Sequence, residues 1–275
     1  MCPVPDTAAA LHARYRDPFV ASAIPLNPVL ESMLAHRSVR GFLRDPLPAG
    51  ALEMAVAAAS SAPTSSNLQT WSVIAVEDQA RRDRLAVHAS GQKFIPVAPL
   101  LLMWIADLSR LEGIAAARQQ AVAGPEYLEL LFVAMIDAAL AAQNAVVALE
   151  SMGLGSVYIG AMRNKPEAVA AELGLPPRSF CVFGLSVGHP DPAVATAVKP
   201  RLPQSAVLHR ETYSLASQAP AIEAYDPRMS AFQEEQGMAD EIWTERCINR
   251  VRTPASLGGR DRMRDALAAL GFALK

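Results

Sequence analysis

Cysteine is scarce in this chain of 275 residues, and the three that occur, Cys2, Cys181 and Cys247, lie far apart. None belongs to a CxxC pair, and an odd number of distant cysteines does not suggest a disulfide framework. No apolar stretch precedes Cys2, as a lipid anchor would require, and the N-terminus lacks the pattern of a signal peptide. We therefore expect a cytoplasmic protein with reduced thiols.

An excess of positive charge is also missing, because 25 lysines and arginines stand against 27 acidic residues and give a net charge of −2. Proteins that follow a phosphate backbone carry clustered excess lysine and arginine. We therefore expect no nucleic acid partner. The five histidines are scattered, and none has a second ligand three or four residues away, so the sequence predicts no metal site.

Long apolar runs are limited to one segment, residues 128–152, which is long enough to cross a bilayer. Glu129, Asp137 and Glu150 interrupt this segment, and carboxylates inside a membrane span are costly. Its apolar residues surround nearly the whole circumference of a helix, which is typical of a helix buried in a protein core or a subunit interface. We therefore predict a buried helix and no membrane partner.

The remaining pattern predicts an α+β fold with a central mixed sheet of four to five strands flanked by helices. Because a strict βαβ alternation is absent, a doubly wound dinucleotide-binding sheet is disfavoured. Strands are expected at 71–76, 100–106, 157–159 and 180–187, and helices at 29–35, 52–61, 78–89, 126–152 and from an Asn164 N-cap to about 174.

A change of composition predicts the organisation of the chain in three parts. Residues 1–27 form an N-terminal extension without strong periodicity, and residues 28–205 form the core. Residues 206–275 are more polar and form a C-terminal helical extension. Helical patterns occur in this extension at 220–236, 240–251 and 260–270.

Two familiar motifs occur without the context that their chemistry needs. Ser186 stands in a GxSxG pattern, but a nucleophile elbow requires a helix directly after the turn, and Pro190 follows instead. Gly153 and Gly155 begin a dinucleotide fingerprint, but Tyr158 occupies the third glycine position and the segment precedes a strand. The sequence therefore favours an ordinary buried strand over a serine hydrolase or a dinucleotide site.

Three polar segments carry the strongest signal. Residues 36–40 (HRSVR) and 199–201 (KPR) contain cations and a hydroxyl that could hold an anion such as a phosphate. Residues 62–69 (APTSSNLQ) contain small hydrogen-bonding groups of the kind that border a polar ring system. Taken singly, the first segment is equally a solvated charged edge, and the third is a turn that satisfies its own backbone. Their co-occurrence favours a bound nucleotide-like cofactor.

These segments resemble those of the FMN-dependent nitroreductase family, and most closely its oxygen-insensitive NADPH nitroreductase and flavin reductase branch. The resemblance implies a homodimer with two FMN sites at the subunit interface, where the long helix lies and the C-terminal helices wrap the partner. It also implies ping-pong transfer of a hydride from NADH or NADPH to FMN, and then of two electrons to a small-molecule acceptor such as a nitroaromatic compound, a quinone or a flavin. The matching segments, in order, are residues 36–42, 65–69, 91–93, 153–155, 158–160, 183–185 and 199–203.

The resemblance further implies a role for each site residue. It assigns the FMN phosphate and ribityl chain to His36, Arg37, Ser38, Lys199 and Arg201, and the pyrimidine edge to Arg40 and Gln92. It assigns Thr64, Ser65, Ser66, Asn67 and Gln69 to the site of the other subunit, and the flavin face and its N5 side to Tyr158, Ile159 and Gly160. Hydride transfer needs stacked reactants and no side-chain acid or base, so no catalytic residue is expected.

One segment departs from this branch, whose members carry arginines for the NADPH 2′-phosphate ahead of a tryptophan-bearing helix. Residues 234–243 read EEQGMADEIW here, with four carboxylates and no cation. We therefore expect NADH to serve at least as well as NADPH. Two alternatives stay open: a flavin-binding or sequestering protein without enzymatic activity, and a different FMN enzyme on the same scaffold.

Overall fold

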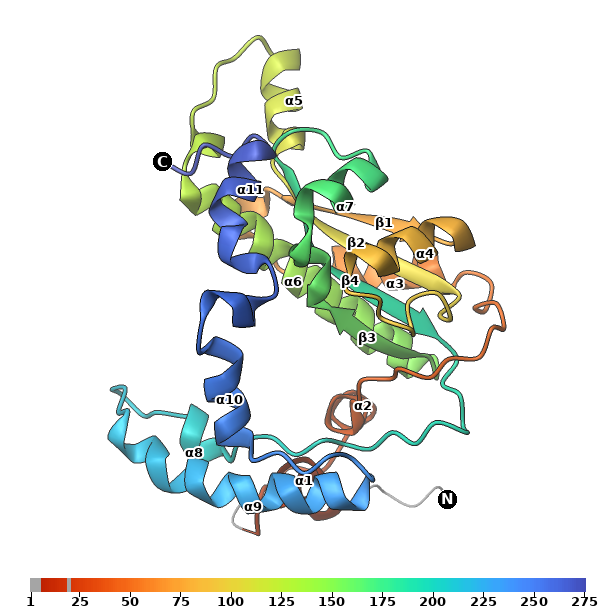
Figure 1. The fold of residues 1–275 in the computed structure, drawn as a ribbon, viewed down its shortest axis with the longest axis vertical. Helices are drawn as coiled ribbons and strands as arrows, with labels where there is room; N and C mark the ends of the chain where they lie inside the picture. Colours follow the sequence, from red (N-terminus) through yellow and green to blue (C-terminus); the bar gives the residue numbers. More distant parts are fainter. Residues whose placement is uncertain (1–5, 19–20) are drawn as a thin grey trace. The chain divides into compact units, whose positions relative to one another are not determined.

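The computed structural model describes residues 6–18 and 21–275, so the expectation for Cys2 lies outside the described residues. The chain divides into two compact units (Figure 1). The smaller combines Met1–Arg37 with Ala195–Ser256, and the larger combines Ser38–Val194 with Leu257–Lys275. The three-part division at residues 27/28 and 205/206 stays a prediction.

The larger unit contains a four-stranded sheet in the order β1-β2-β4-β3. All three pairings are antiparallel: β1 pairs with β2, β2 with β4, and β4 with β3. Strands β2 and β3 run in the same direction on either side of β4, and the long helix α6 lies between them in the chain. The one parallel pairing in the described part of the chain is an isolated bridge between Ser38 and Ser156. The α+β class and the number of strands are confirmed, and the sheet is mixed only through this bridge. The strands are β1 (Trp71–Val76), β2 (Leu100–Asp107), β3 (Gly155–Ile159) and β4 (Ser179–Gly188).

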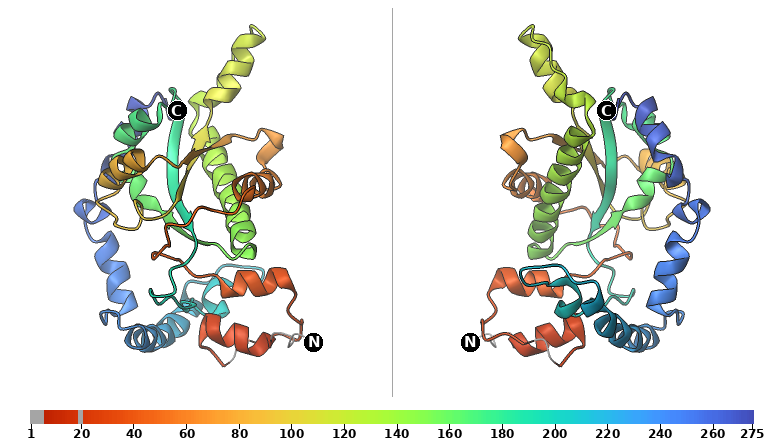
Figure 2. Two further views of the ribbon diagram at one scale, coloured as in Figure 1. Left: turned by 90° about the vertical axis from the view of Figure 1, so that its right-hand side faces the viewer. Right: turned by 90° about the vertical axis from the view of Figure 1, so that its left-hand side faces the viewer.

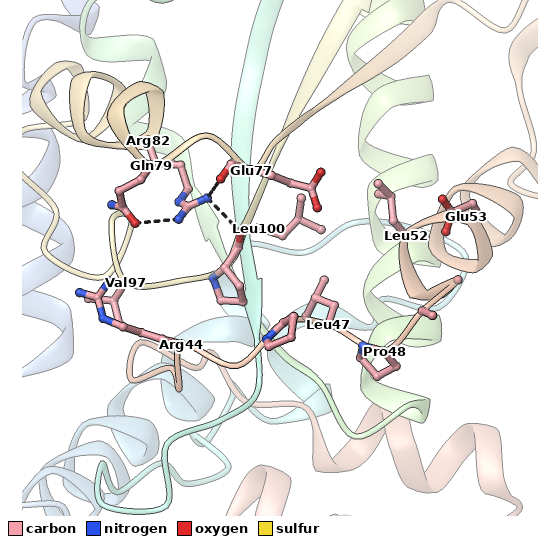
Figure 3. Close-up of a pocket in the computed structure, with 14 residues that line it drawn as sticks. Arg44, Leu47, Pro48, Leu52, Glu53, Glu77, Gln79, Arg82, Val97 and Leu100 are labelled. Carbon is pink, nitrogen blue, oxygen red and sulfur yellow. Dashed lines mark hydrogen bonds between the residues drawn. The ribbon is translucent and has the colours of Figure 1, made fainter.

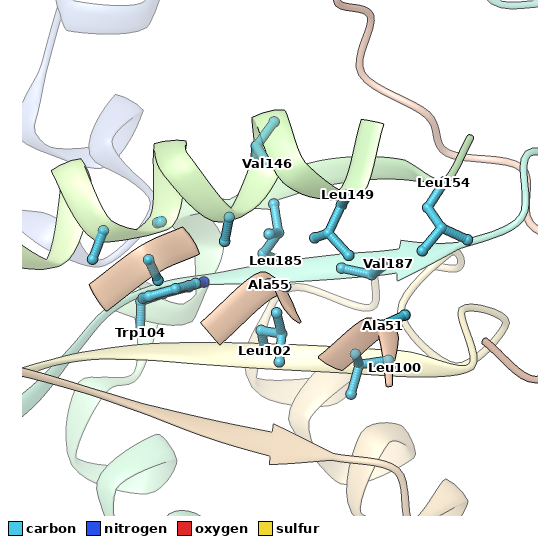
Figure 4. Close-up of a cluster of buried hydrophobic side chains, with 14 residues drawn as sticks. Ala51, Ala55, Leu100, Leu102, Trp104, Val146, Leu149, Leu154, Leu185 and Val187 are labelled. Atoms are coloured by element: carbon cyan, nitrogen blue, oxygen red, sulfur yellow. The ribbon is translucent and has the colours of Figure 1, made fainter. Parts of the chain in front are cut away.

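Helices cover both faces of this sheet (Figure 2). Successive side chains of a strand point to opposite faces, and β2 shows this alternation within a wholly apolar run. Leu100, Leu102 and Trp104 pack with helices α3 and α6 (Figure 4), whereas Leu101 and Met103 pack on the other face with α4 and α7. The helices of this unit are α3 (Ala51–Ser60), α4 (Gln79–His88), α5 (Ser109–Ala117), α6 (Leu128–Ser151), α7 (Pro166–Leu173) and α11 (Met263–Ala269).

The long helix α6 belongs to the protein core and is not a membrane span. Its length and composition alone would allow it to cross a bilayer. Ala138, Ala141 and Ala145 are buried against the sheet, together with Leu149. The same helix exposes a row of large apolar side chains, which is taken up below. The prediction of a buried helix is therefore confirmed for one face.

One local prediction was wrong. Asn164 does not cap α7, because its side-chain amide donates to Ser90 Oγ at 2.8 Å and the N-cap is Lys165.

The N-terminal extension, where no element was predicted, contains helix α1 (Thr7–Tyr15). This helix begins at an Asp6 N-cap, whose carboxylate accepts from the backbone N–H of Ala8 at 2.9 Å.

The smaller unit is entirely helical in its described part. Its small core is formed by Tyr225, Met229 and Phe232, against which Leu202 and Trp243 pack. The helices of this unit, besides α1, are α2 (Pro28–Ala35), α8 (Gln204–Val207), α9 (Ala219–Glu235) and α10 (Trp243–Val251).

Candidate functional site

Within the smaller unit, a buried arginine brings two of the predicted cationic segments together. Arg14, at the end of α1, is only 7% exposed. Its guanidinium donates to the carbonyl oxygens of Leu34 at 2.8 Å, His36 at 2.7 Å and Lys199 at 3.1 Å. The backbone N–H of Arg201 in turn donates to the carbonyl of Arg14 at 2.9 Å. Residues 36 and 199–201, far apart in the sequence, are therefore neighbours in space.

Two exposed guanidinium groups flank this junction. Arg37 Nε donates to Thr196 Oγ1 at 3.0 Å, and Arg201 Nη1 donates to the carbonyl of Lys199 at 3.2 Å. Among the described residues, neither Arg37 nor Arg201 forms an ion pair with a carboxylate. Forked donors that are not neutralised by an acid suit a doubly charged ester group. The donor set in this unit therefore fits the phosphate of FMN.

Tyr225 fixes the backbone of Pro200, which lies between Lys199 and Arg201 in the sequence. Its hydroxyl donates to the carbonyl of Pro200 at 2.8 Å, and the residue is buried. Burial raises the pKa of the Tyr225 phenol, so the hydroxyl remains a donor.

In the larger unit, the segment after Arg37 runs beside the edge of the sheet. The backbone N–H of Val39 donates to the carbonyl of Ser156 at 2.9 Å. A Cβ on Gly155 would lie 2.6 Å from Val39 Cγ2, so only glycine allows this close approach. Gly155 is thus explained by its packing against Val39, and Gly153 by its φ of +76° directly after α6, so neither glycine calls for a dinucleotide.

The residues predicted to face the flavin, Tyr158, Ile159 and Gly160, lie at the end of β3 and directly after it. Tyr158 is 37% exposed and packs edge-on against Phe183, with ring centroids 5.1 Å apart. Its hydroxyl lies 3.4 Å from Gln143 Oε1, and burial, assisted by the charge of Glu150, raises the pKa of the phenol. Ile159 is buried in the core. Gly160 begins the short helix that follows, beside the guanidinium of Arg163.

The polar loop before β1 is organised by a buried carboxylate of α6. Asp137 is 2% exposed. It accepts hydrogen bonds from Thr64 Oγ1 at 2.6 Å, from the backbone N–H of Ser65 at 3.2 Å, and from the N–H and hydroxyl of Thr70 at 3.1 and 2.9 Å. Four donors directed at one acid fix both ends of the loop.

The middle of this loop has an unusual backbone. Ser66, Asn67 and Gln69 adopt φ angles of +50°, +55° and +53°, a region that non-glycine residues rarely occupy. The strain is held in place by the surrounding contacts, and such strain is common at ligand sites. Asn67 and Gln69 border a cavity of about 670 Å³ that Trp71 and Arg110 also line. The loop therefore presents a fixed polar surface to an open hollow.

The structure does not bring all the predicted residues together. Arg40 is exposed and Gln92 is half-buried, and in the described part of the chain no hydrogen bond joins either side chain to another predicted site residue. Ser38 is bridged to Ser156 of β3, and both Ser156 and Leu100, the first residue of β2, pair with Val187 of β4. At the other end of β2, the backbone N–H of its last residue, Asp107, donates to the carbonyl of Thr70, where the polar loop ends. Within the larger unit, residues 38–40 and 64–69 therefore lie at opposite ends of the sheet.

The serine-hydrolase alternative finds no support in the geometry. Ser186, of the GxSxG pattern, is 0% exposed inside β4 and cannot act as a nucleophile. No cluster of three metal-ligating side chains occurs among the described residues.

A second cavity of about 470 Å³, near Arg44 and Glu53 (Figure 3), contains none of the predicted site residues. Its buried Arg82 is engaged by the carbonyls of Glu77 and Pro99 and by Gln79, as Figure 3 shows, so it has a structural role.

The smaller unit contributes a cluster of cations, and the larger unit contributes an antiparallel sheet covered by helices and a strained polar loop. These features suit an α+β protein that binds a phosphorylated cofactor. Comparison with known families identifies it more closely. Residues 33–189 match the Nitroreductase family, and residues 199–275 match the C-terminal domain of that family. The chain belongs to the nitroreductase family.

Individual relatives agree with this membership. The chain is 36% identical over 232 residues to the FMN reductase (NADPH) of Bacillus subtilis, which covers 82% of this chain and 92% of the relative. It is 37% identical over 227 residues to the FMN reductase [NAD(P)H] of the same organism, covering 80% and 89% of the two chains. The solved structure of the NfrA1 nitroreductase from B. subtilis superposes with a TM-score of 0.83 at 34% identity, covering 89% of this chain and 99% of that one.

Two residues that shape the site were not among those predicted from the sequence. Asp137 had been noted only as an interruption of an apolar helix, although a carboxylate in the middle of such a helix signals a buried polar partner. Arg14 gave no comparable signal, because its partners are backbone carbonyls, which no sequence pattern marks.

Proposed function

We propose that the protein is an FMN-dependent oxidoreductase that takes a hydride from NADH or NADPH and reduces a small-molecule acceptor, such as a flavin, a nitroaromatic compound or a quinone. The observation that carries the proposal is the meeting of residues 36–37 with residues 199–201 around Arg14. Family membership and the names of the relatives support it.

In this proposal the cationic segments hold the cofactor at its charged end. His36, Arg37, Ser38, Lys199 and Arg201 bind the phosphate and the ribityl chain. A guanidinium can contact two phosphate oxygens at once, whereas an ammonium acts as a point charge, so the two arginines fix orientation and the lysine adds attraction.

The remaining residues set the environment of the flavin ring. When bound, FMN supplies the redox chemistry by accepting a hydride at N5 and passing two electrons on in a second half-reaction. Arg40 and Gln92 would hold the pyrimidine edge, and the charge of Arg40 would stabilise the reduced state. Backbone groups of Tyr158, Ile159 and Gly160 would border the N5 side, and no side chain needs to donate or accept a proton for the hydride step.

The proposal includes a homodimer in which each site uses both subunits. The seven-residue offset between the levels of Leu100 and Asp107 amounts to about 23 Å along a strand. One FMN molecule is too short to reach both residues 38–40 and residues 64–69 of a single larger unit. A second copy therefore contributes Thr64, Ser65, Ser66, Asn67 and Gln69 to each site.

The exposed face of α6 supports the same dimer. Phe132, Ile136 and Leu140 are 51%, 57% and 40% exposed and follow one another at helical spacing. Contiguous exposed apolar side chains mark interaction surfaces. We propose that this face packs against the partner subunit, that the C-terminal helices wrap the partner, and that the dimer works in the cytoplasm.

The visible spectrum of the purified protein tests this function. We expect a yellow protein that bleaches under anaerobic conditions when NADH or NADPH is added and regains its colour with an acceptor. A yellow protein that neither nucleotide bleaches would indicate a flavin carrier. A colourless protein that binds no added FMN would contradict the proposal.

A panel of acceptors separates this proposal from another FMN enzyme on the same scaffold. Turnover of nitroaromatics, quinones or flavins with steady consumption of the nucleotide supports it. Bleaching by the nucleotide without turnover of any of the three classes would point to a different reaction.

A further inference from the structure

We propose that Arg14 is a positioning residue that assembles the phosphate-binding part of the site, so that the N-terminal helix α1 contributes to cofactor recognition. This inference rests on the proposed function. It assigns a role to a segment that precedes both stretches matched by the family models, 33–189 and 199–275.

The contacts of Arg14 connect three segments of the smaller unit. The fork of its guanidinium reaches the carbonyls of Leu34 and His36 through Nη2 and the carbonyl of Lys199 through Nη1. A guanidinium is well suited to this task, because its rigid planar donors fix several acceptors relative to one another. At 7% exposure the group is shielded from water, which strengthens each charge-assisted bond.

The backbone of α1 reinforces the same junction. Its last turn closes at the Arg16 C-cap, where φ is +48° and the N–H donates to the carbonyl of His12 at 2.7 Å. This turn directs the carbonyl of Arg14 toward the N–H of Arg201. Arg14 therefore holds one cationic segment by its side chain and the other by both its side chain and its backbone.

The bonded carbonyls belong to the residues that carry the phosphate donors, or lie next to them. The carbonyl of His36 is part of the peptide group that includes the N–H of Arg37, so fixing it fixes the direction from which the Arg37 side chain leaves the backbone. The carbonyl of Lys199 accepts from both Arg14 and Arg201. Without Arg14 these donors would have to be ordered by the phosphate itself, which costs conformational entropy on binding.

This role predicts a loss of affinity that is specific for the phosphate. FMN and riboflavin differ only in that group. Disorder in the phosphate-binding part of the site therefore weakens FMN binding more than riboflavin binding. A merely structural defect would weaken both alike. The ratio of the two dissociation constants therefore separates positioning from general damage.

The test is a fluorescence titration of the full-length chain, freed of flavin, with FMN and with riboflavin. For Arg14→Ala we expect the Kd for FMN to rise about tenfold and the Kd for riboflavin to change less than about twofold. Arg14→Lys, which keeps the charge and loses the fork, should fall between Arg14→Ala and wild type. His12→Ala is the matched control on the same helix, since the His12 side chain is exposed and takes no part in the bonds from Arg14 to residues 34, 36 and 199, and both constants should stay within about twofold of wild type.

Each outcome decides a different point. If Arg14→Ala is folded by circular dichroism and retains the wild-type ratio of the two constants, the role of Arg14 is overturned. If Arg14→Ala does not fold, Arg14→Lys decides, and an unchanged ratio in that variant overturns the role equally. If the wild-type chain binds neither flavin, the proposed function fails and this inference fails with it.

Discussion

The hydroxyl of Thr64 donates to the carboxylate of Asp137 at 2.6 Å, across 73 positions of sequence. This bond, with three others to the same acid, connects the polar loop to the middle of α6. The loop needs such an anchor, because Ser66, Asn67 and Gln69 occupy left-handed backbone conformations that an unrestrained chain would leave.

Replacing Asp137 should therefore loosen the loop without changing the helix. For Asp137→Asn we expect the free energy of unfolding to fall by about 2 kcal/mol, because an amide can accept fewer of the four hydrogen bonds and buries an amide donor. FMN affinity should fall as well. Chemical denaturation and flavin titration measure the two effects. Glu129→Gln, at an exposed position of α6, should alter neither, and an equal loss in that variant would count against the anchor.

Replacing Gly155 should disturb the segment that follows Arg37. For Gly155→Ala we expect a loss of about 1 to 3 kcal/mol in the free energy of unfolding, because the new methyl group would overlap Val39. The double variant Gly155→Ala with Val39→Ala should recover part of the loss. Gly113→Ala is the control, since a Cβ there meets nothing within 4 Å and should stabilise α5 by up to about 1 kcal/mol. A Gly155→Ala variant as stable as wild type would contradict the packing argument.

The acidic segment 234–241 should govern the choice of nucleotide. Both Glu234 and Glu235 are exposed, and Glu235 is engaged by Arg16 in a two-pronged ion pair at 2.7 and 2.6 Å. Among the described residues, no ion pair engages Glu234. A 2′-phosphate approaching this segment meets like charge, so we expect kcat/KM with NADH to be at least as high as with NADPH. Glu234→Lys should shift the ratio toward NADPH. A hundredfold preference of the wild type for NADPH, in steady-state kinetics, would show that the segment does not contact the nucleotide.

Burial of Cys181 should make stability fall at alkaline pH. Burial raises the pKa of this thiol to about 12, chiefly because the thiolate would be desolvated. A raised pKa in the folded state contributes stability that is complete below the pKa of the unfolded thiol, near pH 9, and is lost as the pH rises toward about 12. Cys181→Ser should flatten this decline in denaturation curves measured between pH 8 and pH 11. In the native protein a thiol reagent should modify the exposed Cys247 and leave Cys181 unreacted.

A charge on the exposed face of α6 should separate the subunits. We expect Ile136→Lys to elute as a monomer in size-exclusion chromatography and to lose bound flavin, because each site would lack the polar loop of its partner. Val87→Lys is the control, since Val87 is 65% exposed on α4, away from this face, and should remain dimeric. A monomeric wild type that retains FMN would rule out the shared site.

The sequence predicted the fold where a single periodicity dominates. The limits of β1 and the all-apolar run of β2 follow directly from side-chain alternation and burial on two faces. Helix α1 was not expected, because its alanine-rich turns lack a strong apolar face. Asn164 suggested a cap, but a tertiary hydrogen bond to Ser90 competes with capping. The polar segments were identifiable as a set, whereas the residues that hold them in place act through backbone carbonyls or a buried acid and are visible only in three dimensions.

Two adjacent residues of α6 point in opposite directions: Ile136 is exposed at the surface, and Asp137 is buried in the interior. One inserted residue turns everything beyond it by about 100° about the helix axis. A single insertion between the two positions would rotate the acid away from the loop and direct neighbouring surfaces into the wrong environment. Insertions and deletions are therefore expected in the connecting loops of this protein, and not within this helix.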